Sequence, residues 1–475
     1  MLTYDMQDVK GPLYLYLYNC LKRDIISGKL AADEKLPSKR TFANNNGIST
    51  ITIQNAYDQL VSEGYVYTLP KRGYYVSDIA GTVMPEVKTD ISYDIHIPKE
   101  DTEIVYDLSN NGTDPDNFPF SVWAKVSREI ISNRKNELMK RSPSGGVREL
   151  REAIAGHLKS FRGMLVDPDQ IIVGAGTEYL YGIITQLLGK DKIYAIENPG
   201  YKKLEKIYKE RDIECRFASI DESGITVSEL DRVNADIAHI CPNHHFPTGI
   251  TMPASRRYEV LAWANESEKR YIIEDDYDSE FRTGGKPIPP LFSIDGCEKV
   301  IYINTFSKSL SPTIRISYMV LPVHLANRYY ETMSFYACTV SNFEQYILAE
   351  FIKKGYFEKH INRMRLFYMR QRKSIIEAVE KSPIADSCRI IENDSGLHFL
   401  LKLNLGIETK ELNEMLRDHG IKVNSLDDYY LSGDADEDGL YIVNYSVLTG
   451  NDMRTILDII GDILSSGGRC LGVIK

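Results

Sequence analysis

The chain has 475 residues, 43% hydrophobic and 26% charged, which is ordinary for a soluble globular protein of about three domain-sized units. No apolar run reaches the roughly 18 residues of a membrane-spanning helix, and the N-terminus lacks the basic start and apolar middle of an export signal. The seven cysteines are scattered and form no C-x-x-C pair. This pattern argues against a disulfide framework or a zinc site and predicts a reducing, cytoplasmic location.

The net charge of −10 is distributed unevenly along the chain. Residues 1–77 hold nine Lys or Arg and seven Asp or Glu, whereas the remainder holds 48 and 60. An acidic body repels nucleic acid, so we expect any DNA contact to come from the N-terminal segment.

The N-terminal segment, residues 1–78, has the pattern of a winged helix-turn-helix. Helical apolar spacing is evident in residues 12–30, and residues 38–47 and 49–64 each begin with a serine that can cap a helix and end with a glycine. Two β-prone runs flank residues 70–73, which predicts a hairpin with a basic tip. A short helix, a glycine turn and a second amphipathic helix are typical of a DNA-reading motif.

The rest of the chain predicts a linker followed by an α/β body. Residues 79–104 show no sustained hydrophobic period and mix Pro, Gly and acidic residues, which indicates a linker. Over residues 105–475, apolar strands alternate with amphipathic helices, which indicates a mostly parallel sheet. We expect a large lobe at about 118–322 and a smaller α+β lobe at about 323–475.

Several chemically distinctive residues follow the predicted strands, where open α/β sheets bind their ligands. The turn at residues 174–177 lies between a strand and a helix, where free backbone N–H groups favour a phosphate, although such a turn is weak evidence alone. Asp275 ends an apolar strand on its buried side, and a buried acid is usually paired or functional. Lys308 follows what we expect to be a neighbouring strand.

The stretch TFSKSLSPTIRISYMV, residues 305–320, resembles the cofactor-lysine motif of fold-type I pyridoxal-phosphate (PLP) enzymes, the aspartate aminotransferase superfamily. The resemblance covers about residues 105–475 and implies PLP as the cofactor. It implies that Lys308 is the catalytic Schiff-base lysine and that Asp275 pairs with the pyridine nitrogen. The other cofactor-binding residues that it implies are Arg315, Thr305, Ser307, Gly176 and Thr177 around the phosphate, Tyr201 on the ring, Tyr277 at the phenolic oxygen, and His244.

The N-terminal segment resembles the GntR family, and a GntR-type head joined to this body resembles its MocR subgroup. These are transcription regulators that use PLP or its adducts as effector. The stretches HHFPTG, IEDDYDSEFR and SGLHF carry this closer resemblance, and they place His244 and His398 on histidines of the subgroup. His245 is equally consistent with an ordinary polar loop. We expect no metal site, because no further ligands are evident near these histidines.

Four positions depart from the aminotransferase pattern. Phe246 stands where an asparagine bonds the cofactor, and Arg141 stands where a tyrosine is frequent. Glu178 replaces a common glutamine beside the phosphate, where its charge is unfavourable unless the side chain turns away. The carboxylate-binding arginine would fall near Ile442, and an apolar residue cannot replace a bidentate clamp, although Lys203 or Arg141 are candidate substitutes.

In a helix-turn-helix, the N-terminal end of the second helix contacts base edges and flanking cations contact phosphates. An arginine is frequent in the family where this chain has Thr50, so guanine readout there is not assured. One head with few cations should bind weakly, so we expect a homodimer, as the resemblance of the body also implies. The DNA-binding residues that we predict are Ser49, Thr50, Thr52 and Gln54 at base edges, and Lys39, Arg40, Lys71 and Arg72 at phosphates.

Together these features predict a PLP-dependent transcription regulator that senses PLP or a PLP–amine adduct through Lys308 and binds double-stranded operator DNA. The missing carboxylate arginine favours PLP itself as the effector, and we expect no physiological turnover. The alternative is an active aminotransferase with an accessory N-terminal domain, which Lys308, Asp275 and Arg315 support and which Phe246 and Ile442 oppose. A third possibility is a degenerate scaffold that binds no PLP.

Overall fold

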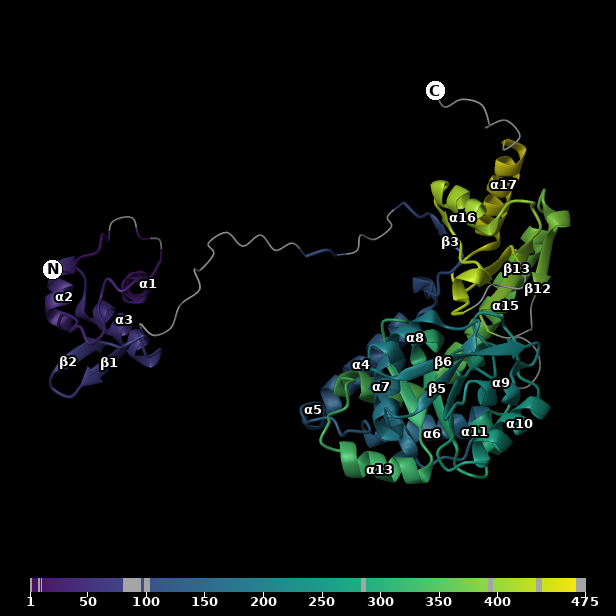
Figure 1. The fold of residues 1–475 in the computed structure, drawn as a ribbon, viewed down its shortest axis with the longest axis horizontal. Helices are drawn as coiled ribbons and strands as arrows, with labels where there is room; N and C mark the ends of the chain where they lie inside the picture. The colour runs from purple at the N-terminus through teal and green to yellow at the C-terminus, as the bar shows by residue number, and fades with distance from the viewer. Residues whose placement is uncertain are drawn as a thin grey trace. The chain divides into compact units, whose positions relative to one another are not determined.

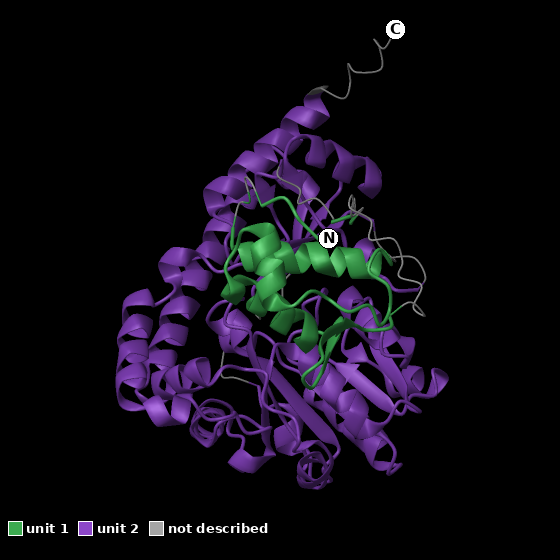
Figure 2. Ribbon diagram, turned by 90° about the vertical axis from the view of Figure 1, so that its left-hand side faces the viewer, with its two compact units in different colours: residues 1–99 green, residues 100–475 purple. Residues whose placement is uncertain are grey.

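The chain forms two compact units, residues 1–99 and 100–475 (Figure 2). Most of the predicted linker, residues 79–104, lies outside the described residues, so its extent stays a prediction. No helix among the described residues is both long and apolar enough to cross a membrane. The computed structural model describes residues 2–6, 9, 11–79, 95–97, 103–282, 288–391, 396–432 and 438–466.

The N-terminal unit consists of three helices and an antiparallel hairpin (Figure 1). The hairpin closes with Val66 opposite Val76 and Leu69 opposite Gly73, which forms the predicted wing. This arrangement confirms the winged helix-turn-helix. The elements are α1 (Leu13–Ile26), α2 (Lys39–Asn46), α3 (Thr50–Ser62), β1 (Val66–Leu69) and β2 (Gly73–Val76).

Two serine caps and one glycine define both ends of α2 and the start of α3. Ser38 Oγ accepts a hydrogen bond from the Thr41 N–H, and Ser49 Oγ accepts one from the Thr52 N–H, so both helix starts are capped. Gly47 has a φ of 63°, in the left-handed region that glycine enters without steric cost, and it ends α2. The buried side chains of the unit include Leu17, Leu21, Phe42, Ile53, Tyr57 and Leu60.

An eight-stranded sheet forms the centre of the second unit, in the order β4-β11-β10-β9-β8-β5-β6-β7. Strands β10, β9, β8, β5 and β6 run parallel, whereas β11 is antiparallel to β10 and β4, and β7 is antiparallel to β6. The sheet is mostly parallel, as predicted. Its strands are β4 (Ile171–Ala175), β5 (Ile193–Asn198), β6 (Glu214–Asp221), β7 (Gly224–Ile225), β8 (Ile237–Ile240), β9 (Tyr271–Asp275), β10 (Val300–Thr305) and β11 (Ile316–Val320).

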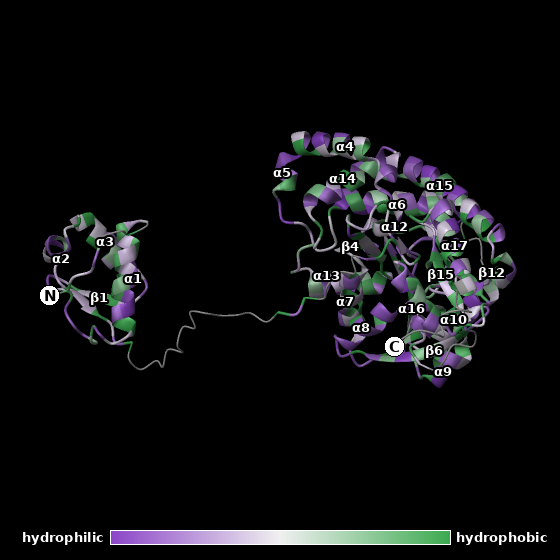
Figure 3. Ribbon diagram, turned by 90° about the horizontal axis from the view of Figure 1, so that it is seen from above, coloured by the Kyte–Doolittle hydropathy of each residue, from purple (hydrophilic) through white to green (hydrophobic). Residues whose placement is uncertain are grey.

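Helices cover both faces of this sheet. Side chains of consecutive strand residues point to opposite faces, and the neighbours Ile272 and Ile273 pack into different hydrophobic clusters. Many of the body's surface helices carry both hydrophilic and hydrophobic residues (Figure 3). One face packs on α7 (Thr177–Leu188), α8 (Lys202–Lys209) and α13 (Val323–Met333). The other packs on α4 (Phe120–Asn133), α5 (Lys135–Leu138), α6 (Arg148–Arg162), α14 (Asn342–Lys353), α9 (Val227–Arg232), α10 (Ala254–Asn265) and α11 (Leu291–Ile294).

A smaller α+β lobe follows. Its main sheet is antiparallel, in the order β12-β13-β15, and β14 pairs in parallel with β3 near the start of the unit. Helices α13 and α14 pack with the large lobe, C-terminal of the predicted lobe boundary at residue 322. The elements are β3 (Tyr106–Asp107), β12 (Cys388–Ile391), β13 (His398–Leu403), β14 (Ile421–Lys422), β15 (Leu440–Asn444), α15 (Tyr356–Glu380), α16 (Thr409–Asp418) and α17 (Gly450–Ser466).

Candidate cofactor pocket and nucleic-acid interface

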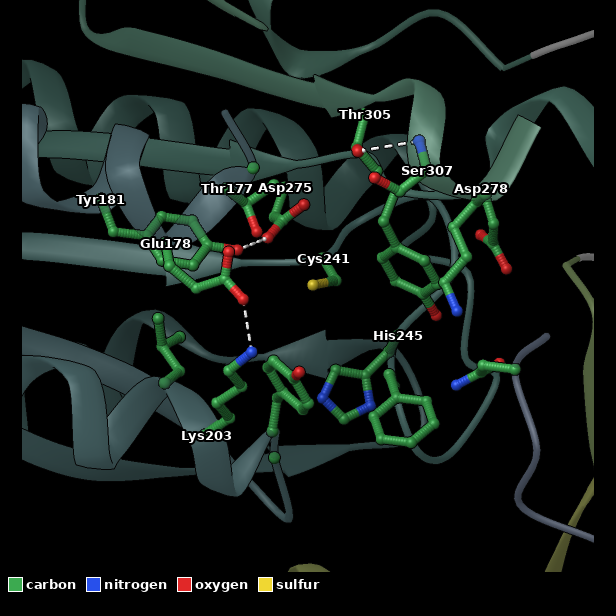
Figure 4. A pocket seen from close by; sticks show the side chains of 18 of the residues that line it. Thr177, Glu178, Tyr181, Lys203, Cys241, His245, Asp275, Asp278, Thr305 and Ser307 are labelled. Atoms are coloured by element: carbon green, nitrogen blue, oxygen red, sulfur yellow. Dashed lines mark hydrogen bonds and ion pairs between the residues drawn. The ribbon is translucent and has the colours of Figure 1, made fainter. Parts of the chain in front are cut away.

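The predicted cofactor residues meet at one pocket beside the carboxyl ends of the parallel strands (Figure 4). The cavity has a volume of about 310 Å³. Of the predicted set, His244 lies outside the lining, and its neighbour His245 lines the cavity. The predicted residues that line it are Gly176, Thr177, Tyr201, Asp275, Tyr277, Thr305, Ser307, Lys308 and Arg315.

Lys308 lies on α12 (Phe306–Ser309), a single helical turn that directly follows β10. Thr305 Oγ1 accepts a hydrogen bond from the Ser307 N–H at 3.1 Å and thereby caps this turn. Burial lowers the pKa of Lys308 to about 8, while the nearby Asp278 carboxylate favours the charged amine. About a tenth of the amine is therefore unprotonated at pH 7, far more than for an ordinary lysine, and this is the form that attacks an aldehyde.

Asp275 is fixed through one of its two carboxylate oxygens. Its Oδ2 accepts a hydrogen bond from Tyr181 Oη at 2.5 Å and lies 3.6 Å from His239 Nε2. Tyr208 Oη and His239 Nδ1 are 2.6 Å apart, which orients the imidazole in turn. The second oxygen, Oδ1, is buried without a hydrogen-bond partner and so offers an acceptor to a donor in the pocket.

The phosphate side of the pocket is built on the turn before α7. Gly176 has a φ of 91°, and a Cβ there would collide with the Arg315 guanidinium and lie 2.7 Å from Glu178 Oε2. Arg315 itself has a φ of 53°, which is strained for a residue with a Cβ. Thr177 is the first residue of α7, so free backbone N–H groups face this end of the pocket.

Glu178 does not turn away from the phosphate side. Its Oε2 accepts a hydrogen bond from Arg315 Nη2 at 2.6 Å, and its Oε1 pairs with Lys203 Nζ (Figure 4). Burial raises the pKa of Glu178, but Lys203, a backbone N–H and Arg315 outweigh burial and lower the pKa to about 2. The Glu178 carboxylate is therefore charged. It forms ion pairs with Arg315 and Lys203, the two cations that were expected to bind an anionic group of the ligand.

His244 lies behind the pocket wall. Its Nδ1 is 2.9 Å from Asp278 Oδ2 and 3.2 Å from Tyr277 Oη, so it connects two lining residues. In the described part of the chain, His244, Asp278 and His398 offer possible metal-ligand atoms within 4.8 Å of one another. A Cβ on Gly396 would collide with the His244 ring, so the Gly396 backbone already fills the space beside this group.

Glu197, which the sequence did not single out, forms part of the same wall. Its Oε2 accepts a hydrogen bond from the Cys241 N–H at 2.9 Å and lies 3.5 Å from His245 Nε2. Burial raises the pKa of Glu197 to about 8, and burial together with His244 lowers the pKa of His245 to about 3. Both side chains are therefore mainly uncharged at neutral pH. No sequence motif marks Glu197 or Tyr181, because their roles depend on contacts between separate strands and helices.

The remaining departures from the aminotransferase pattern have defined surroundings. Phe246 packs against Tyr201, His398 and Tyr429 with ring centroids 5.1 to 6.1 Å apart. Ile442 is buried in an apolar cluster and does not line the cavity, whereas Asn444, two residues later, does. Arg141 Nη2 donates a hydrogen bond to the Phe335 carbonyl at 2.6 Å, and Arg141 is not among the lining residues.

The residues present fit PLP. The orphaned Asp275 Oδ1 can accept a hydrogen bond from a protonated pyridine nitrogen, which is the donor that it lacks. Lys308 supplies a partly desolvated amine on the same pocket wall. Arg315, Lys203 and the start of α7 supply donors for a phosphate, with Glu178 as the one discordant charge.

The predicted DNA-binding residues lie on two parts of the N-terminal unit. Thr50, Thr52 and Gln54 lie in the first turns of α3, of which Thr52 is half-buried, and the Ser49 hydroxyl is engaged as the helix cap. Lys71 and Arg72 are exposed at the hairpin tip. Arg40 is exposed on α2, whereas Lys39 is half-buried with its Nζ 5.8 Å from the Tyr74 ring centroid.

Ile51, which is not among the predicted DNA-binding residues, is 69% exposed in the first turn of α3. A single exposed apolar side chain is common on protein surfaces, so the position of Ile51 at the start of the second helix of the motif is the informative feature. Such a side chain suits contact with a thymine methyl group in the major groove. The helical spacing could have revealed it, because Ile51 falls outside the buried set of Ile53, Ala56, Tyr57 and Leu60.

Comparison with known families assigns both units. Residues 103–435 match the family described as aminotransferase class I and II, and residues 13–76 match the bacterial regulatory proteins of the gntR family. PLP is the cofactor of the first family, so the comparison supports the same group that the pocket fits. The gntR-family head implies binding to operator DNA.

Individual relatives extend over nearly the whole chain. An uncharacterized HTH-type transcriptional regulator of Bacillus subtilis, YdeL, is 38% identical over 416 residues, which cover 87% of this chain and 88% of the relative. The probable rhizopine catabolism regulatory protein MocR of Rhizobium meliloti is 29% identical, with coverage of 90% and 88%.

A solved structure, that of a multiple substrate aminotransferase from Thermococcus profundus, matches with a TM-score of 0.67 at 23% identity, and the match covers 78% of this chain and 93% of that one. At this identity the match establishes the fold of the body. The chain therefore belongs to the HTH-type transcriptional regulators of the MocR type, in which a gntR-family head is joined to a class I and II aminotransferase domain.

Proposed function

We propose that the body senses PLP by covalent capture at Lys308 and that this capture changes how the head binds operator DNA. The observation that carries the proposal is the buried, unpartnered Oδ1 of Asp275 in the same pocket as the Lys308 amine. An orphaned carboxylate oxygen is costly unless a ligand supplies its donor. A site of this kind in a chain with a DNA-reading head supports a ligand-dependent regulator.

Each residue of the pocket has a distinct part in the proposed sensing. Bound PLP would supply an aldehyde carbon for the amine and an electron-withdrawing ring. Lys308, with its pKa near 8, presents the free amine to that carbon. Asp275, held by Tyr181 and His239, keeps a proton on the ring nitrogen. Tyr277, oriented through His244, would offer its hydroxyl to the phenolic oxygen of the ligand.

We further propose that PLP itself, rather than an amino-acid adduct, is the effector. Ile442 is buried against Leu400 and Leu426, so the strand that would carry the carboxylate clamp presents no guanidinium. Among the described lining residues on this side, the hydrogen-bonding groups include the amides of Asn111 and Asn444 and the imidazole of His398, which lies opposite Asn444 in the sheet. Burial lowers the pKa of His398, so these groups are uncharged and bind a carboxylate more weakly than an arginine does.

The test is an electrophoretic mobility-shift titration of operator DNA with and without PLP. We expect PLP to change the affinity or the footprint of the wild type and to have no effect on Lys308→Ala. Lys373→Ala is the matched control, since that lysine is 79% exposed on α15 and outside the pocket. An unchanged DNA affinity and footprint in the wild type would contradict the proposal.

An active aminotransferase is the second candidate, because Lys308, Asp275 and Arg315 all line the pocket. It predicts turnover of amino acids that is lost in Lys308→Ala. Formation of glutamate from a panel of amino-acid donors, assayed with added PLP and with 2-oxoglutarate as the amino acceptor, distinguishes the two. Sustained multiple turnover would establish an enzyme, whereas at most one equivalent per site supports the sensor.

We also propose that the protein acts as a homodimer in the cytoplasm. Met139 and Phe335 are 74% and 66% exposed, and the Arg141 side chain links their two segments. Exposed apolar side chains gathered in this way favour a protein interface. Analytical ultracentrifugation should give twice the chain mass, and Phe335→Glu should shift the equilibrium towards the monomer.

A further inference from the structure

The anion-binding end of the pocket contains an acid where a ligand phosphate needs cations. Glu178 is the second residue of α7 and Lys203 the second residue of α8, so their ion pair joins the starts of two helices that follow β4 and β5. Arg315, from the loop before β11, approaches the same carboxylate from the other side. One carboxylate thus engages both cations.

The charges in this group favour competition. Arg315 and Lys203 carry two positive charges, and Glu178 carries one negative charge, because their contacts hold its carboxyl ionised. A phosphate dianion that approaches the same cations meets like-charge repulsion from Glu178 and finds Arg315 Nη2 and Lys203 Nζ already bonded to that carboxylate. Charge-assisted bonds to one anion must therefore be exchanged for bonds to the other.

Steric crowding supports the same conclusion. A Cβ at Gly176 would collide with the Arg315 guanidinium and lie 2.7 Å from Glu178 Oε2, so the ion pair lies directly on the turn whose N–H groups would receive a phosphate. The Glu178 side chain is 29% exposed and Lys203 is 50% exposed, which leaves both free to swing towards solvent. Displacement of the pair therefore requires no rearrangement of the core.

We propose that Glu178 is an internal competitor for the phosphate site: its carboxylate holds Arg315 and Lys203, and a ligand phosphate binds by displacing it. This proposal rests on PLP as the ligand and adds what sets the affinity of the sensor. Displacement weakens PLP binding, which suits a protein that responds to the PLP concentration rather than one that holds PLP permanently. Displacement of Glu178 also breaks the Glu178–Lys203 ion pair between the starts of α7 and α8 when PLP binds.

The test compares PLP with pyridoxal, which has the same aldehyde and ring but no phosphate. We expect Glu178→Gln to raise the affinity for PLP about tenfold or more, since one charged hydrogen-bonding competitor is lost, and to leave the affinity for pyridoxal nearly unchanged. Binding is followed by the visible absorbance of the captured ligand. Glu178→Ala should act in the same direction, and Glu210→Gln, at an exposed position at the end of α8, is the matched control.

A second readout uses inorganic phosphate alone. Phosphate should raise the melting temperature of Glu178→Gln more than that of the wild type, because only the variant offers unoccupied cations. An equal gain for PLP and pyridoxal, or no gain for PLP, would overturn the competitor role while leaving PLP sensing intact. Failure of both proteins to capture PLP or pyridoxal would overturn PLP sensing and, with it, the competitor role.

Discussion

At the scale of single residues, the reactivity of the pocket depends on how burial sets the pKa of Lys308. Lys308 is half-buried, and the desolvation of its ammonium lowers the pKa to about 8. The rate of pyridoxal capture should therefore rise with pH and level off above about pH 8, because only the free amine attacks the aldehyde. Stopped-flow absorbance between pH 6 and 10 would measure this. A flat profile would show that the amine is already deprotonated at pH 6.

Glu197 affects the stability of the folded protein, because burial raises the pKa of its carboxyl group. Its folded-state pKa of about 8 lies above the ordinary value of 4.5, so the folded protein keeps a proton that the unfolded chain releases. The free energy of unfolding should fall as pH rises from about 4.5 to about 8. Glu197→Gln removes this penalty, so its gain in stability over the wild type should grow with pH and reach roughly 3 kcal/mol at pH 7.

Urea denaturation at several pH values would measure this gain. Glu210→Gln, an exposed charge change of the same kind, should show no comparable pH dependence. An equal gain for Glu197→Gln at pH 4 and pH 8 would mean that the carboxyl group titrates normally in the folded protein.

The sequence predicted those pocket residues that carry a local motif. Lys308 and Arg315 lie in one continuous stretch, and Asp275 ends a recognisable apolar strand, and all three line the pocket that the resemblance to PLP enzymes implies. Tyr181 and Glu197 could not be found in this way. Tyr181 lies on a helix 94 residues before Asp275 in sequence and hydrogen-bonds to it. Glu197, on β5, accepts a hydrogen bond from the backbone of Cys241, which follows the adjacent strand β8.

At the scale of elements, we predict that α3 contacts the base edges of the operator. Ile51→Ser should lower the affinity for the cognate operator by about tenfold, as expected for loss of one base-specific contact, while leaving the salt dependence unchanged. Replacing Lys71 and Arg72 with glutamine should instead weaken binding to all sequences and reduce the salt slope by about one per lost phosphate contact. Fluorescence anisotropy at several salt concentrations separates the two effects, and an unchanged operator affinity would exclude Ile51 from base contact.

The elements themselves were largely predictable, because both units follow simple periodicities. Serine caps and glycine stops located α2 and α3, and apolar runs located the central strands. The assignment of α13 and α14 to a lobe was not predictable in the same way. Both helices are amphipathic, like many others in the body. Where they pack depends on the complementary apolar surfaces of α7, for α13, and of α6, for α14.

At the scale of the whole molecule, ligand affinity and DNA response should change together. If Glu178 competes with phosphate, Glu178→Gln should reach its half-maximal DNA response at about one-tenth of the PLP concentration that the wild type needs. The maximal response should stay the same, because the substitution alters occupancy and not the head. A mobility-shift titration in PLP measures both values, with Glu210→Gln as the control. A changed maximum at an unchanged midpoint would place Glu178 in signal transmission instead.

The left-handed backbone at Arg315 has a consequence for the resting stability of the protein. A side chain held at a φ of 53° costs on the order of 1 kcal/mol, and glycine would adopt the same backbone freely. Arg315→Gly should therefore lose little thermal stability, or even melt higher than the wild type, while it no longer responds to phosphorylated ligands. The phosphate-binding arginine would then be a position where the fold accepts backbone strain in order to orient a positive charge towards the ligand.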